Sequence, residues 1–116
     1  EEHKTWLNKL AFYEDELKIM DNRILEVAKK NTAKEVRSLA DHFNNQLIIQ
    51  KEQIDILTHD IKSHELYLEA AALDNPNSID TEKFFDHKKH RESIATFEKL
   101  FKDLREDLIE FLSKWM

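Results

Sequence analysis

The sequence lacks glycine and cysteine altogether and contains a single proline, Pro76, among its 116 residues. Average usage would give a chain of this length about eight glycines and about six prolines. Tight hairpin turns and strand–helix turns depend on glycine, so the composition argues against β-sheet architectures and excludes glycine-rich phosphate loops. The lack of cysteine excludes disulfides, thiol nucleophiles and cysteine zinc sites.

A basic surface and a long apolar run are missing as well. Lys and Arg number 18 against 24 Asp and Glu, which gives a net charge of −6. An acidic chain without a basic stripe argues against nucleic acid and anionic membranes as partners. No apolar run approaches the ~18 residues of a membrane span, and no signal peptide is visible, so we expect a cytoplasmic protein.

Apolar residues instead recur at alternating spacings of three and four, which is the pattern of helices packed in a bundle. Three segments carry the pattern. The first contains Trp6, Leu10, Tyr13, Leu17, Met20, Ile24 and Val27. The second contains Val36, Ala40, Phe43, Leu47, Gln50, Ile54, Leu57, Ile61, His64, Leu68 and Ala71. The third contains His90, Ile94, Phe97, Phe101, Leu104, Leu108, Phe111 and Trp115.

Two short breaks separate these segments. At the first, Thr32 and Glu35 have the spacing of a capping box, and Asn31 is suited to the left-handed conformation that ends a helix. The second surrounds Pro76, which disfavours helix at the residue before it. We therefore expect helices at 3–30, 33–74 and 79–115. Short connections force neighbours to be antiparallel, so the predicted fold is an all-α, elongated three-helix bundle with up-down-up topology.

We expect the three helices to form a single domain over 1–116. Their predicted lengths differ. At 1.5 Å per residue the second helix is ~63 Å long and the first only ~42 Å. The first helix therefore runs out near Ile61 of the second. Residues 62–90 should form a helical-hairpin extension. The core is expected around Phe43, Leu47, Ile54, Phe101, Leu104 and Leu108.

Histidines gather at that same end. His64 and His90 occupy inward positions, His3 continues the first series, and His59 and His87 lie nearby. Asp60 and Asp86 each precede one of these histidines by four residues, which places carboxylate and imidazole on one helical face. Such a set could bind zinc, iron or manganese. The tentative ligands are His64, His90, Asp60 and Asp86, completed by His3 or His87.

The competing interpretation is a solvated helix end. The first helix stops here, so the inward positions become wetter and apolar side chains lose their advantage. The Glu-x-x-His motif of di-iron bundles does not occur in the sequence. A polar exception elsewhere, Gln50, is expected opposite Tyr13, where a Tyr–Gln hydrogen bond would satisfy both groups.

Apolar residues of the extension exceed what two helices can bury against each other, and an exposed patch of this kind marks an interface. The candidate interface residues are Leu66, Tyr67, Leu68, Leu73, Phe84 and Phe85. No nucleophile–base–orienter set is visible. The first functional hypothesis is therefore a non-catalytic interaction or scaffold module that self-associates or binds a protein partner through 62–90. The alternative is a metal-binding bundle.

Overall fold

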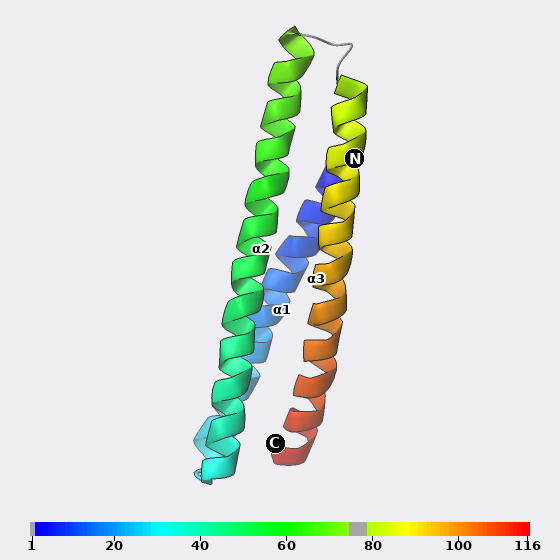
Figure 1. The fold of residues 1–116 in the computed structure, drawn as a ribbon. Helices are drawn as coiled ribbons and strands as arrows, with labels where there is room; N and C mark the ends of the chain where they lie inside the picture. The colour runs from blue at the N-terminus through cyan, green and yellow to red at the C-terminus, as the bar shows by residue number, and fades with distance from the viewer. Residues whose placement is uncertain (1, 75–78) are drawn as a thin grey trace.

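The protein is an elongated bundle of three helices (Figure 1). The computed structural model describes the backbone of residues 2–74 and 79–116, and the side chains of these residues except 71, 72, 74 and 79–86. Helix α1 spans Glu2–Lys30, α2 spans Lys34–Asp74 and α3 spans Ile79–Trp115. The molecule measures 63 × 19 × 18 Å. The predicted all-α fold and its three helices are confirmed, with the first two helices starting within one residue of the expected positions.

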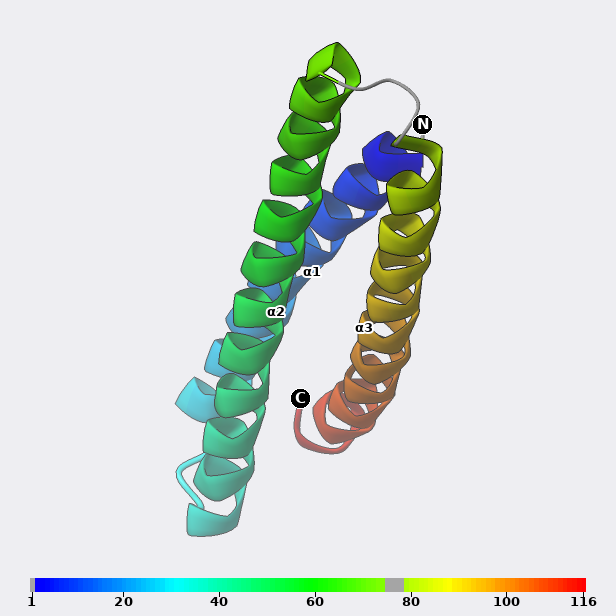
Figure 2. The ribbon, with the colours of Figure 1, turned by 45° about the horizontal axis from the view of Figure 1, so that its top comes forward.

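The helices alternate in direction, so α1 and α3 run parallel to each other and antiparallel to α2 (Figure 2). At the top of Figure 1, α2 and α3 continue past the beginning of α1. None of the three helices, over their described residues, is long and apolar enough to cross a membrane.

The core follows the alternating spacing of the sequence along the whole bundle. All six residues expected at its centre are buried, and the third-helix residue Phe101 is completely so. Tyr13 packs its ring 4.6 Å from that of Phe101 and 5.5 Å from that of Phe97, measured between centroids. Aromatic pairs at such distances stabilise a core beyond the area they bury.

The turn between α1 and α2 differs from the expected one. Among the described residues no non-glycine residue has a positive φ, so Asn31 does not adopt the left-handed conformation. Its side-chain amide instead donates to the carbonyl oxygens of Val27, at 3.0 Å, and Trp115, at 3.1 Å. Asn31 thereby ends α1 and ties it to the last turn of α3.

The first residue of α2 is also shifted relative to the predicted capping box. The carbonyl of Ala33 accepts the first helical hydrogen bond, from the backbone nitrogen of Arg37 at 3.1 Å. Ala33 therefore occupies the cap position in place of Thr32. The predicted turn around Pro76 lies outside the described residues.

The expected Tyr13–Gln50 hydrogen bond is not formed. The Tyr13 hydroxyl donates to Oε2 of Glu98 on α3 at 2.7 Å. Burial and this carboxylate together raise the pKa of Tyr13 to about 12. Gln50 is buried, and its Oε1 has no hydrogen-bond partner among the described residues.

Candidate functional site: a histidine cluster at the start of α1

Four histidines from all three helices meet where α1 begins. The ring centroid of His3 lies 5.3 Å from that of His64 on α2, 4.7 Å from His87 and 6.4 Å from His90, both on α3. The His64 ring lies 6.0 Å from His87 and 5.1 Å from His90. We call His3, His64, His87 and His90 the histidine cluster.

Burial distinguishes this cluster from a solvated helix end. His3 and His64 each expose only 8% of their surface, while His87 and His90 are half-buried. His64 occupies an inward position three residues after Ile61, and Ile94, four residues after His90, is buried too. The same spacing that builds the core therefore turns these imidazoles inward, and two of the four are removed from water.

One carboxylate orients a ring of the cluster. Nδ1 of His3 lies 3.2 Å from Oε1 of Glu65 on α2. Burial lowers the pKa of His3, and the nearby His64 acts in the same direction, while Glu65 opposes both. A neutral His3 donates its Nδ1–H to Glu65, which leaves the lone pair on Nε2. That Nε2 atom is buried without a hydrogen-bond partner among the described residues.

Trp6 covers one side of the cluster. Its ring centroid lies 5.5 Å from that of His3, 5.7 Å from His87 and 6.3 Å from His90. The indole is itself buried. An aromatic wall of this size excludes water and lowers the local dielectric, which strengthens any polar interaction inside the cluster.

The other residues of the predicted metal set lie elsewhere. Asp60 is exposed and lines a groove between α2 and α3, together with Lys89 and Ser93. The side chain of Asp86 lies outside the described residues. His59 is exposed, with Nε2 3.5 Å from the Ser63 hydroxyl. The structure thus assembles the predicted histidines, whereas Asp60 faces a different surface.

The cluster is packed ring against ring. As the side chains stand, no three His, Asp or Glu residues in the described part of the chain are placed to hold a metal ion. The arrangement brings four imidazoles into one small volume, with tilted and edge-on contacts between neighbouring rings. Its chemistry is that of a nitrogen-rich, largely buried site with one oriented lone pair.

Two members of the site were not recognised from the sequence. Trp6 was assigned to the core only, although it lies three residues after His3 and so shares its face. Glu65 adjoins His64, but a position beside the inward-facing series gives no sign of which histidine its carboxylate reaches.

The predicted interface residues on α2 come after His64 in the sequence. Leu66, Tyr67 and Leu73 are exposed, and Leu68 is half-buried. The side chains of Phe84 and Phe85 lie outside the described residues. The described apolar residues of the extension on α2 are therefore mostly on the surface.

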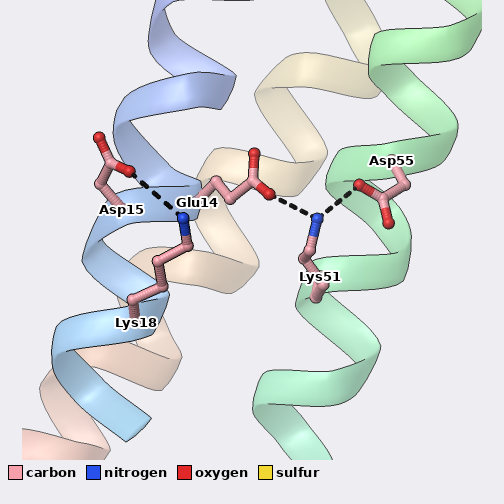
Figure 3. Close-up of polar contacts among 5 residues, drawn as sticks. All are labelled: Glu14, Asp15, Lys18, Lys51 and Asp55. Carbon is pink, nitrogen blue, oxygen red and sulfur yellow. Dashed lines mark hydrogen bonds and ion pairs between the residues drawn. The ribbon is translucent and has the colours of Figure 1, made fainter. Parts of the chain in front are cut away.

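A second surface feature is a groove between α1 and α2, with Leu17, Leu47 and Ile48 along its floor. Its rim carries ion pairs, shown in Figure 3: Nζ of Lys51 lies 2.5 Å from Oε1 of Glu14 and 2.8 Å from Oδ1 of Asp55. These carboxylates raise the pKa of Lys51. The lining of the groove carries three carboxylates, Glu14, Asp21 and Glu52, against the two ammonium groups of Lys18 and Lys51.

Comparisons of the chain with known protein families, with curated proteins and with solved structures gave no match. The functional argument therefore depends on the residues and their geometry.

Proposed function

We propose that the protein is a non-catalytic helical interaction module that self-associates through its 62–90 end. The observation that carries the proposal is the exposure of large apolar side chains on α2 in this region, namely Leu66, Tyr67 and Leu73. Glu2, in the first turn of α1, pairs with Arg91 of α3, with Oε1 and Nη2 2.6 Å apart. Beyond that level α2 and α3 continue as two helices without α1 (Figure 1).

Several apolar side chains of the extension on α2 are left uncovered. Leu68 continues the inward series of α2 but is only half-buried, and Leu66 and Leu73 are exposed by 67% and 88%. Exposed apolar side chains also occur elsewhere, for example Ile19 and Ile109. What distinguishes the extension is that the inward position Leu68 is only half-buried, whereas the inward positions of α2 from Val36 to His64 are buried. A further helix beside the extension would bury its apolar side chains, at about 25 cal/mol per Å² of apolar surface.

The charges of the extension favour a second copy of the chain as the occupant. Near the cluster α2 carries more acidic than basic residues, namely Asp60, Lys62, Glu65 and Glu69. The facing stretch of α3, residues 86–92, carries three basic residues, Lys88, Lys89 and Arg91, against two acidic ones, Asp86 and Glu92. In a two-fold dimer with α2 of one copy beside α3 of the other, the acidic stretch of α2 would face Lys88 and Lys89 of the second copy.

Sedimentation velocity of the purified chain tests this proposal. We expect a dimer at micromolar concentrations, and monomers of unchanged helicity for Leu66→Asp and Leu73→Asp. Ile109→Asp is the matched control, because Ile109 is exposed on α3 at the opposite end of the bundle. It should remain dimeric. A wild type that stays monomeric at high concentration, or a control that dissociates as readily as the extension variants, would overturn the proposal.

A further inference from the structure

We infer that the histidine cluster is a binding site for a zinc-type divalent transition ion, with His3, His64, His87 and His90 as its four ligands. The inference is independent of the self-association proposed above. It replaces the mixed histidine–aspartate ligand set expected from sequence with imidazoles alone. Neutral imidazole is a preferred ligand of zinc, copper and nickel, whereas manganese and magnesium favour oxygen.

The ring separations carry the inference. With Zn–N bonds of about 2.0–2.1 Å and a ring centre about 1.1 Å behind each nitrogen, four tetrahedral imidazoles have centroids about 5.2 Å apart. The five separations that involve His3 or His64 run from 4.7 to 6.4 Å. Three helices therefore already hold the rings at nearly the spacing that a tetrahedral ion requires.

Ligation requires the rings to turn so that their nitrogen atoms face a common point. The Cβ–Cγ bond of histidine points through the ring centre, so turning χ2 re-aims both nitrogens and leaves the centroid in place. This torsion has broad, shallow preferences compared with the staggered torsions of aliphatic side chains. In the packed arrangement no three ligand-type residues of the described chain are placed to hold an ion, so the inference requires that the ion re-orient the rings when it binds.

His3 is already oriented as a ligand. Its Nδ1 faces the Glu65 carboxylate at 3.2 Å, and its Nε2 is buried with no hydrogen-bond partner in the described structure. Metal-bound histidines typically donate their other ring N–H to a carboxylate, which fixes the tautomer and makes the ligand more basic. Glu65 occupies this position, and its negative charge offsets part of the charge of the ion.

The surroundings shield part of the site from solvent. Trp6 lies against three of the four rings, and Ile61 and Ile94 are buried one turn away on α2 and α3. Because the ligands come from three helices, the ion would join the first turn of α1 to the other two. Four protein ligands are typical of a structural metal site.

Competition of the full chain with a chromophoric chelator for zinc chloride at pH 7.5 tests the inference. We expect one zinc per chain with a micromolar or lower dissociation constant. His64→Ala should weaken binding at least a hundredfold, and Glu65→Gln about tenfold. His42→Ala and His59→Ala replace exposed histidines outside the cluster and should bind as the wild type does.

If His64→Ala fails to fold, His90→Ala provides the test in its place. His90 is only half-buried, so His90→Ala should keep its helical circular dichroism spectrum while losing the zinc site. With Trp115→Phe as background, Trp6 is the remaining tryptophan and its fluorescence should be quenched by cobalt(II). Binding that is absent, or weakened equally by the His42 and His59 variants, or Trp6 fluorescence unaffected by cobalt, would overturn the inference.

Discussion

The two ends of the bundle obey the same helical spacing with opposite chemistry. At the α1–α2 turn the inward positions hold Val27 and Val36, both completely buried, and the Phe43 and Phe111 rings lie 5.0 Å apart. At the start of α1 the equivalent positions hold His3 and His64. Helical periodicity decides which residues face inward, and the residue type then decides whether the position stabilises the fold or imposes a desolvation cost. We conclude that stability is concentrated toward the apolar end.

The largest effect should come from deleting an apolar core side chain. Phe101→Ala removes a fully buried ring that contacts Tyr13 and Phe97. We expect the free energy of unfolding, measured with urea, to fall by about 3–5 kcal/mol. Leu100→Ala, at a neighbouring position that is 52% exposed, is the control and should change little. Equal effects of the two substitutions would show that the core is misplaced.

Acid should weaken the histidine end selectively. Because burial lowers the pKa of His3, the folded state favours its neutral form over the unfolded state. The stability from this group is therefore complete above pH about 6.5 and is lost as the pH falls through that value toward the lower folded pKa. The neighbouring His64 lowers the pKa of His3 further, while Glu65 opposes both effects.

Urea unfolding of the metal-free protein at pH 8, 7, 6 and 5 measures this dependence. We expect His3→Leu to show a flatter profile than the wild type, because it removes the buried titrating group. His42→Gln, which alters an exposed histidine, should reproduce the wild-type profile. Identical slopes for His3→Leu and the wild type would mean that this end does not govern the acid response.

A smaller loss of unfolding free energy is expected from removing the Asn31 side chain, which joins α1 to α3 at the apolar end of the bundle. Asn31→Ala removes the two side-chain hydrogen bonds to the carbonyl oxygens of Val27 and Trp115. At about 0.5–1.5 kcal/mol for each bond, the unfolding free energy should fall by about 1–3 kcal/mol. Lys30→Ala, one residue earlier on an exposed position, is the control. A loss no larger than that of the control would show that this side chain does not contribute.

The smallest effect should come from the exposed ion pairs of Figure 3. Lys51→Met removes the contacts with Glu14 and Asp55. These side chains remain substantially exposed, so solvent screens the interaction and we expect a change below about 1 kcal/mol. Thermal unfolding in low and high salt measures it. A larger loss would show that these ion pairs, in the middle of the bundle, contribute strongly to its stability.

Helix positions and inward faces could be predicted from the sequence because they depend on spacing along one chain. Phe101 and His64 were both placed correctly by this reasoning. Contacts between helices were harder, because they depend on side-chain length and on the rotation of each helix about its axis. Tyr13 reaches Glu98 on α3 in place of Gln50, and the side-chain amide of Asn31 bonds to the last turn of α3. Neither partner is indicated by sequence spacing.

The polar contacts between α1 and α3 also fix the register of the bundle. Glu2 with Arg91, Tyr13 with Glu98 and Glu16 with Arg105 join residues 85 to 89 positions apart along the chain. Because the two helices are parallel, sliding α1 by one heptad would break all three contacts together. The same slide would carry His3 about 10 Å from its neighbours, at 1.5 Å per residue. The histidine cluster is therefore a sensitive indicator of register errors that begin anywhere along α1.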